Sequence, residues 1–312
     1  MKIAFFWTGE FSKNILEWIL KNWNIDVQLV VSQPDKPVWR NKVIEETAVK
    51  QLAKQHNIKV LQPERFKNNT EFFSELKSLD LDFIVVVAYG KIVPSQVLDN
   101  PKYGCINIHG SILPLYRWAS PIQEAVKNWD KETWLTIMYM SKWMDEWDIL
   151  AINKIEIDKL DTTKDIFNKF EIIWPELLIN TLNWVIDWSI KWVKQDDSKA
   201  TYCSKISKED AEINFINDSW INIFNKYRAY HTWPWIYTYY NNKKLDIEDC
   251  ELLNYERNEK IWKVLKIDKK TIWIVCKDKK ILILRQIKLE WKKSMDILSF
   301  ANWNKDFLEY NF

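Results

Sequence analysis

Short apolar runs alternate with segments of helical spacing along the first 190 residues. The runs are rich in Val, Ile and Phe, which is typical of strands buried on both faces of a parallel sheet. They occupy residues 2–6, 26–32, 82–88 and 104–109. Apolar residues three and four positions apart predict the helices 11–22, 45–56, 70–79 and 163–187. The pattern therefore predicts an α/β domain with a mostly parallel sheet covered by helices.

The pattern changes after Lys205. A helical stretch is expected over 207–228, and several consecutive strands follow it. These strands are expected at 235–240, 244–253, 263–267, 271–277 and 281–289. Consecutive strands with tight turns predict a small antiparallel barrel. We therefore expect a first domain over 1–189, a polar linker over 190–205 and a second domain over 206–312.

Charge adds one feature to this layout. The formal net charge is only +2, but residues 260–293 hold 12 basic and 3 acidic residues. Such a block is a candidate surface for a polyanion, although a solvated, lysine-rich face of a sheet explains it equally well.

Several protein classes are excluded by what the sequence lacks. The N-terminal apolar run is too short for a signal peptide, and no run reaches the ~18 apolar residues of a membrane helix. The four cysteines are widely spaced without a C-x-x-C pair, and three histidines stand in unrelated contexts. We therefore expect a monomeric cytoplasmic protein with reduced thiols and without a metal site.

Tryptophan and glycine have unusual frequencies. The chain has 20 Trp and 4 Gly in 312 residues, whereas about 7% Gly, or about 22 residues, is usual. Many tryptophans stand in Asn/Asp contexts such as NWN, NWD and DWS, which are turn signals if the central residue is glycine. Our hypothesis is that most tryptophans stand for UGA codons that the source organism reads as glycine. The alternative is a Trp-rich binder with stacking platforms.

Candidate chemistry follows the strand at 104–109. Asn107 and His109 are two residues apart, so they project from one face near the carboxyl end of a parallel strand, where open α/β sheets bind ligands. Asn offers an oxyanion donor and His a titratable group. In the loop SKWMDEWDIL, Asp145 follows another apolar run and is placed to orient His109. A structural Asn-x-His pair and a turn-forming Asp satisfy the same pattern.

Six motifs in order over nearly the whole chain resemble the methionyl-tRNA formyltransferases. They are FFWTGEF, QPDKPVWR, VVVAYGKIVP, GCINIHGSILPLYRWASPIQ, TIMYMSKWMDEWDIL and YRAYHTWPWIYT. In that family positions 7, 39, 118, 134, 143, 147 and 235 would be glycine, while Trp233 matches a family tryptophan. The resemblance implies a Rossmann-like formyltransferase domain followed by an OB-like barrel that binds tRNA.

The resemblance also implies the activity and its residues. The reaction is formyl transfer from 10-formyltetrahydrofolate to the α-amino group of methionyl initiator tRNA, without a metal. Asn107, His109 and Asp145 would be the catalytic trio. The folate co-substrate would contact Tyr89, Gly90 and the segment SILP, residues Ser111, Ile112, Leu113 and Pro114. The tRNA would contact a loop with Lys36, Arg40 and Lys42, which is less lysine-rich than the family pattern.

Three alternatives remain open at this stage. With glycine at position 7, GTGEFS is part of a dinucleotide fingerprint, but Ser12 replaces a small residue and no acidic partner follows. A formyltransferase that acts on an amino-sugar nucleotide would have the same trio and a similar second domain. A non-enzymatic RNA-binding module would leave the motifs at 104–150 unexplained.

Overall fold

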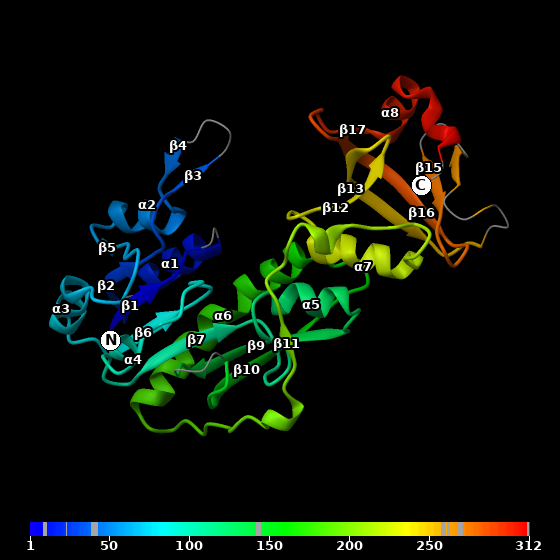
Figure 1. The fold of residues 1–312 in the computed structure, drawn as a ribbon. Coiled ribbons are helices and arrows are strands. Elements are labelled where there is room, and N and C mark those ends of the chain that lie inside the picture. Colours follow the sequence, from blue (N-terminus) through cyan, green and yellow to red (C-terminus); the bar gives the residue numbers. More distant parts are fainter. Residues whose placement is uncertain are drawn as a thin grey trace. The chain divides into compact units, whose positions relative to one another are not determined.

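The computed structural model describes residues 1–8, 11–22, 24–38, 43–141, 145–256, 260, 263–266, 271–310 and 312. It divides into two compact units, and each is drawn in Figure 1. The first unit comprises residues 1–121, 133–155 and 168–203. The second comprises residues 122–132, 156–167 and 204–312.

A seven-stranded sheet forms the centre of the first unit, in the order β10-β9-β7-β6-β1-β2-β5. Its strands are β1 (Lys2–Phe6), β2 (Asp26–Val31), β5 (Lys59–Leu61), β6 (Phe83–Val86), β7 (Cys105–His109), β9 (Glu132–Tyr139) and β10 (Ile149–Glu156). The five strands from β7 to β5 run parallel, and β9 pairs antiparallel with β7. The predicted mostly parallel α/β sheet is confirmed.

Helices follow the strands of this sheet, as the helical spacing predicts (Figure 1). They are α1 (Phe11–Lys21), α2 (Ala48–Gln55), α3 (Thr70–Ser78), α4 (Ser95–Leu98), α5 (Pro121–Lys127) and α6 (Thr163–Ile186). The apolar face of α3 packs against the central strands, because Phe72 and Leu76 share a buried cluster with Phe6 and Val86. Removal of this apolar surface from water stabilises the layered arrangement.

An antiparallel sheet forms a half-barrel in the second unit, as the sequence predicts. Its order is β12-β13-β16-β15-β14, and β17 pairs with β16. The strands are β12 (Ile236–Tyr240), β13 (Lys243–Leu253), β14 (Val264–Lys266), β15 (Ile272–Val275), β16 (Ile281–Leu289) and β17 (Met295–Asp296). The helices α7 (Trp220–Tyr230) and α8 (Ile297–Trp303) belong to the same unit.

The helix expected over 207–228 is shorter in the structure. Only α7 is α-helical there, and a single 3₁₀ turn (Glu209–Ala211) precedes it. Asn214 accepts hydrogen bonds from the backbone N–H groups of Ile216 and Asn217, which makes a local turn. Ser219 then caps α7 by accepting from the N–H of Asn222. Short polar side chains that bind nearby backbone thus replace the helix before Trp220.

The segment expected to be a linker, 190–205, is hydrogen-bonded to the rest of the first unit over much of its length. Its strand β11 (Tyr202–Cys203) pairs in parallel with β8 (Arg117–Trp118). The N–H of Val193 donates to Ile149 at 2.9 Å, and the N–H of Arg117 donates to Thr201 at 2.9 Å. This segment therefore has defined contacts beside the loop that follows β7.

Tryptophan side chains occupy unusual positions for this residue type. Five described tryptophans have a positive φ: Trp118, Trp129, Trp188, Trp235 and Trp291. Two of these five side chains are strongly exposed, Trp188 at 78% and Trp291 at 76%, and so is Trp303, at 86%, which has no positive φ. In the loop after β9, Asp145 has a positive φ, of 60°, and Trp147 does not, while Trp143 lies outside the described residues.

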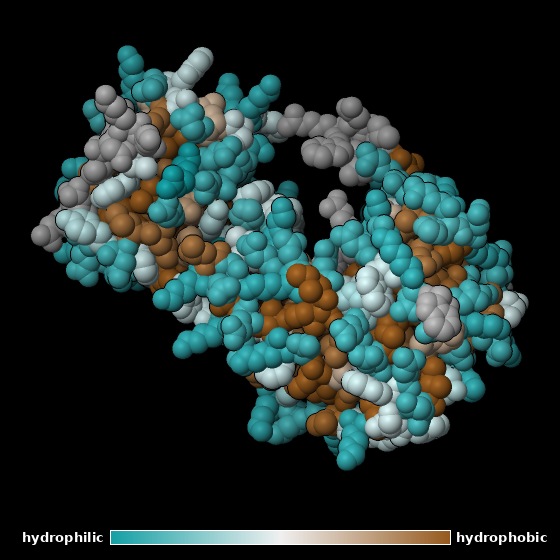
Figure 2. Space-filling model, turned by 180° about the vertical axis from the view of Figure 1, so that it is seen from behind, coloured by the Kyte–Doolittle hydropathy of each residue, from teal (hydrophilic) through white to brown (hydrophobic). Residues whose placement is uncertain are grey.

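Polar side chains cover most of one face of the molecule. On the face drawn in Figure 2, hydrophilic residues predominate and hydrophobic ones form separate patches. Within the described part of the chain, no helix combines the length and the apolar character needed to cross a bilayer.

Candidate active site

Asn107 and His109 both lie on β7, between β6 and β9 in the sheet. They are two residues apart and therefore project from the same face of the strand. His109 is buried, with 6% of its surface exposed, and Asn107 is half-buried. The strand thus presents one amide and one imidazole together, as the sequence predicts.

Asp145 approaches this pair from the loop after β9. Its Oδ1 accepts from Nδ2 of Asn107 at 3.4 Å, and its Oδ2 lies 3.8 Å from Nδ1 of His109. Oδ2 also accepts a 2.8 Å hydrogen bond from the backbone N–H of Trp118. Asp145 has a positive φ of 60°, a conformation that Asp tolerates better than a bulky residue does. The three predicted catalytic side chains are therefore brought together.

Both ring nitrogens of His109 face oxygen atoms. Nε2 is 2.9 Å from the carbonyl oxygen of Tyr116, and Nδ1 faces the carboxylate of Asp145. A neutral ring can donate at only one nitrogen, whereas an imidazolium donates at both. The ring can therefore donate to the carbonyl of Tyr116, to the carboxylate of Asp145 or, as an imidazolium, to both.

The predicted folate segment follows β7 directly. Ser111 is fully buried, and its hydroxyl donates to the carbonyl of Leu115 at 2.6 Å. The hydroxyl of Thr136 donates to the carbonyl of Ser111 at 2.5 Å. Leu113 is buried, while Ile112 and Pro114 are partly exposed. The hydroxyl of Ser111 is thus already used in a hydrogen bond within the loop itself.

Tyr89 and Gly90, the other predicted folate contacts, follow β6. Tyr89 is buried, which raises the pKa of its phenol, and its carbonyl accepts from Nε2 of Gln33 at 2.8 Å. Gly90 has φ of 75°, and a Cβ there would lie 2.8 Å from the same Gln33 nitrogen. Both the backbone angle and the close approach of Gln33 therefore favour glycine at this position.

The predicted tRNA loop forms a hairpin of β3 (Lys36–Val38) and β4 (Val43–Glu45), which stands clear of the sheet in Figure 1. Lys36 is exposed, whereas Arg40 and Lys42 lie outside the described residues. Asp35 anchors the base of the hairpin by accepting from Lys50 at 2.5 Å and from Gln62 at 2.7 Å. Burial opposes ionisation of Asp35, but these partners hold the pKa of its carboxyl below the usual value.

Two residues that were not predicted as site residues, Gln195 and Arg117, contact the loop of residues 145–147. Gln195 donates from Nε2 to the carbonyls of Asp145 at 2.9 Å and Trp147 at 2.6 Å. Its Oε1 accepts from Nη2 of Arg117 at 2.8 Å. Gln195 lies in a polar segment 50 residues from Asp145, so no local pattern marks it. Burial lowers the pKa of Arg117, but Asp197 and Tyr202 outweigh it and keep the pKa above the usual value.

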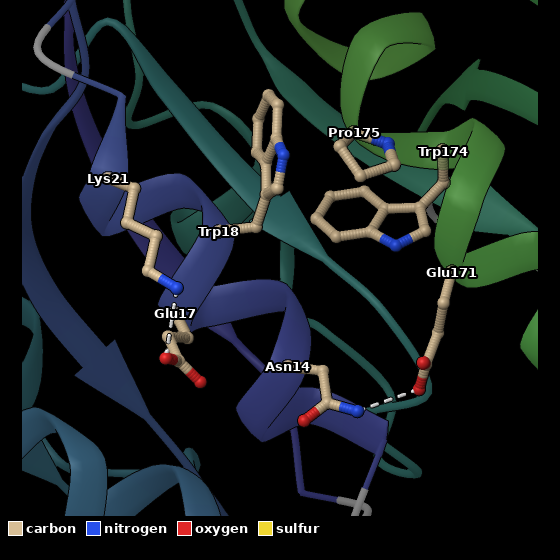
Figure 3. Close-up of a pocket in the computed structure, with 7 residues that line it drawn as sticks. All are labelled: Asn14, Glu17, Trp18, Lys21, Glu171, Trp174 and Pro175. Atoms are coloured by element: carbon tan, nitrogen blue, oxygen red, sulfur yellow. Dashed lines mark hydrogen bonds and ion pairs between the residues drawn. The ribbon is translucent and has the colours of Figure 1, made fainter.

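A separate cavity of ≈ 210 Å³ lies between α1 and α6 (Figure 3). Trp18 and Trp174 face each other across it, and Asn14 donates to Glu171 at 2.8 Å. Its lining includes none of the predicted catalytic or folate residues. Because pockets for drug-sized ligands span roughly 300–1,000 Å³, this cavity is too small for a folate.

The basic block of the second unit is described in part. Exposed cations there include Lys277, Lys279, Lys288, Lys292 and Lys293. Arg285 is paired with Glu251 on the neighbouring strand, so part of its charge is already compensated. Among the residues that the structure describes, no three His, Cys, Asp or Glu side chains gather as metal ligands.

Comparison with known proteins shows which family has this two-domain fold. The chain matches the family model described as formyl transferase over residues 1–182. It matches the model of the formyl transferase C-terminal domain over residues 205–305. The α/β unit and the half-barrel thus correspond to the two domains of a formyltransferase.

Curated relatives of known function show which kind of formyltransferase the chain resembles. The chain is 39% identical over 307 residues to the methionyl-tRNA formyltransferase of Caldicellulosiruptor saccharolyticus, covering 98% of this chain and 97% of the relative. It is 37% identical over 302 residues to that of Sulfurimonas denitrificans, covering 97% and 96%. The chain therefore belongs to the methionyl-tRNA formyltransferase family, as the motifs indicate.

A solved structure supports the fold over both units. An N-formyltransferase from Helicobacter canadensis, solved with folinic acid and dTDP-3-aminofucose, aligns with a TM-score of 0.64. The alignment covers 91% of this chain and 97% of that chain at 20% identity. At this identity the likeness concerns the fold alone.

Proposed function

We propose that the protein transfers the formyl group of 10-formyltetrahydrofolate to the α-amino group of methionyl initiator tRNA, in the cytoplasm and as a monomer. The observation that carries the proposal is the convergence of Asn107, His109 and Asp145 at the end of β7. Asn107 and His109 come from β7 and Asp145 from the loop after β9, and the carboxylate of Asp145 lies 3.4 Å from Asn107 and 3.8 Å from His109.

The nucleophile of this reaction is supplied by the substrate. An α-amino group has a pKa of about 7.7–8.0, so a substantial part is neutral near pH 7.5. It attacks the formyl carbon, and a tetrahedral oxyanion forms. The new carbon–nitrogen bond is kept while the bond from carbon to the folate nitrogen breaks. No enzyme nucleophile is needed, which agrees with a site built from an amide, an imidazole and a carboxylate.

The trio would supply an oxyanion donor and a proton route. The Nδ2 amide of Asn107 is a neutral donor for the oxyanion. His109, with a water, would accept a proton from the ammonium nitrogen that forms in the tetrahedral intermediate and return one to the folate nitrogen as it leaves. Asp145 would hold the imidazole in orientation and stabilise its charged form, because its Oδ2 faces Nδ1.

Two surfaces would bind the substrates. The segment Ser111–Pro114 with Tyr89 and Gly90 would hold the folate near the end of β7. The hairpin with Lys36, Arg40 and Lys42 and the lysines of 260–293 would contact the tRNA phosphates. Such contacts dominate affinity for nucleic acids and depend on salt.

The test compares two acceptors. The chain is prepared as printed and with glycine at every tryptophan except Trp233, and each form receives 10-formyltetrahydrofolate. Charged initiator tRNA or a dTDP-linked amino sugar is then added, and formylated product is measured. Faster formylation of the tRNA is expected. Faster turnover of the sugar nucleotide by the active form would contradict the tRNA assignment and favour an amino-sugar formyltransferase.

A further inference from the structure

A buried arginine and glutamine connect the predicted linker to the catalytic loop. Arg117 has 1% of its surface exposed and Gln195 has 6%. Arg117 donates to Oε1 of Gln195 through Nη2 at 2.8 Å and through Nε at 3.2 Å. The bidentate contact orients the carboxamide, so that Nε2 of Gln195 points to the loop that contains Asp145.

Gln195 uses both donors of its amide on that loop. One carbonyl acceptor belongs to Asp145 at 2.9 Å and the other to Trp147 at 2.6 Å. These bonds hold the backbone on both sides of residue 146. The side chain of Asp145 is held separately, by the N–H of Trp118. Arg117, acting through Gln195, therefore positions the backbone of Asp145, and the adjacent residue Trp118 positions its side chain.

The same segment also holds the partner of His109. The N–H of Tyr116 donates to the hydroxyl of Thr201 at 2.8 Å, and the carbonyl of Tyr116 faces Nε2 of His109 at 2.9 Å. The segment 195–203 thus contacts the backbone of Asp145 through Gln195, and it contacts Tyr116, the partner of His109, through Thr201.

From this geometry we infer that Gln195 is a positioning residue for formyl transfer, an inference that rests on the proposed function. It acts by fixing the loop that presents Asp145 to His109. A residue that supports a catalytic group in this way typically changes the rate by about 10- to 100-fold when it is replaced.

Two substitutions of Gln195 test this role. Gln195→Glu keeps the volume and the acceptor for Arg117, but it places an oxygen against the carbonyls of Asp145 and Trp147. Gln195→Met keeps the length of the side chain but removes its hydrogen bonds. This variant replaces Gln195→Glu in the test if the charged variant does not fold. The expected result is a fall in kcat of about 10-fold or more, with the KM for both substrates nearly unchanged. Asp197→Asn is the control, because Asp197 contacts Arg117 from an exposed position.

A double-mutant cycle separates positioning from a general structural effect. In an Asp145→Ala background, replacing Gln195 should change kcat by less than about twofold, because its effect passes through Asp145. An equal loss in both backgrounds would overturn the inference, as would wild-type kcat in both Gln195 variants. If the parent chain formylates no tRNA, the proposed function fails instead, so the two failures are distinguishable.

A different observation carries a second inference, about the tryptophans. Trp118, Trp129, Trp188, Trp235 and Trp291 have φ between 61° and 80°. Left-handed backbone is costly for bulky L-residues and free of that cost for glycine. Three of the five, Trp118, Trp188 and Trp291, are also at least 47% exposed, so burial of the indole does not offset the strain. The structure assigns glycine to these five positions in the native protein, in agreement with the recoding hypothesis.

Mass spectrometry of the protein from its source tests this assignment directly. Peptides that cover the five positions should have the residue mass of glycine, and tryptophan mass at these positions would overturn the inference. The thermal stability of recombinant variants provides a second test. Glycine at all five positions should raise the Tm by about 5 °C or more, whereas Trp233→Gly, at an ordinary φ, should lower it. A lower Tm for the five-glycine chain would contradict the argument from φ.

Discussion

Arg117 in the first unit and Arg285 in the second both pair with carboxylates, but their surroundings differ. The side chain of Arg117 is 1% exposed and contacts Gln195, Asp197 and, at 3.8 Å, Glu146. Arg285 is 49% exposed and pairs with Glu251, which is 50% exposed. A buried cation depends on its buried partners, here Gln195, because water cannot replace them. An exposed cation loses little when its partner is removed.

The same difference separates the two proposed activities. The proposed site at the end of β7 would use three buried or half-buried polar groups at fixed distances, so that a change in one group would alter the chemistry. The half-barrel presents many exposed lysines, such as Lys288 and Lys292, whose effect on tRNA would be a sum over charges. Rate should therefore respond to single substitutions, and tRNA affinity to the number of charges and to salt.

The largest effect is expected for the catalytic trio. Asn107→Ala, His109→Ala and Asp145→Ala should each lower kcat by about 100- to 1000-fold, because each removes an oxyanion donor or part of the proton route. The affinity for tRNA should be nearly unchanged. Single-turnover formylation and a filter-binding assay measure the two quantities.

The control for the trio is His56→Ala, since His56 is an exposed histidine of the same unit. Its kcat should stay close to that of the parent chain. A trio variant that retains more than about a tenth of the parental kcat would remove that residue from the mechanism.

The two arginines give a matched comparison of stability. Arg117→Met should lower the free energy of unfolding of the first unit by about 1.5–3 kcal/mol, because hydrogen bonds to a buried charged group are lost. Arg285→Met should cost about 0.2–1 kcal/mol, as is usual for exposed ion pairs. Urea unfolding followed by circular dichroism measures both. Equal losses would show that burial does not determine the effect.

A smaller effect is expected for charges on the half-barrel. Replacing Lys288, Lys292 and Lys293 together by Ala should lower the slope of log affinity for tRNA against log salt by about 2, if each contacts one phosphate. The binding constant is measured between 50 and 200 mM salt, a range in which such contacts are visible. The matched control replaces three exposed lysines of the first unit, Lys13, Lys21 and Lys77. If the salt slope of the control variant falls by the same amount, the three lysines of the half-barrel are not a specific contact surface for tRNA.

The smallest effect concerns His231 in the second unit. Burial lowers the pKa of this imidazole below its usual value near 6.5. The unfolded chain then binds a proton more readily than the folded unit, so stability is retained above about pH 6.5 and falls as the pH drops through that region. His231→Asn should flatten the change in Tm between pH 7 and pH 5. An unchanged pH dependence in this variant would assign the effect to other groups.

Local patterns of residues determined much of the architecture. Apolar runs at 2–6, 26–32 and 104–109 correspond to β1, β2 and β7, because a strand buried on both faces needs apolar residues throughout its length. The helix expected over 163–187 is α6, Thr163–Ile186. The N-x-H spacing placed Asn107 and His109 on one face of a strand, since alternation in a strand is strictly local.

Local patterns misled where short polar side chains compete with the backbone. The helix expected from residue 207 begins only at Trp220, because Asn214 and Ser219 bind the backbone around them. In the catalytic loop the positive φ belongs to Asp145 rather than to Trp147. Such choices depend on which side chain reaches which N–H group, and spacing alone does not express this.

Only the tertiary structure decided how the site is supported. Arg117 and Gln195 are 78 residues apart, and Gln195 and Asp145 are 50 apart. Nothing in the polar segment 190–205 marks Gln195 as different from its neighbours. Its role arises because folding buries it, and a buried amide must find partners for its donors and its acceptor. The sequence by itself specified the strand that presents His109, and packing over long separations selected the residues that hold Asp145 against it.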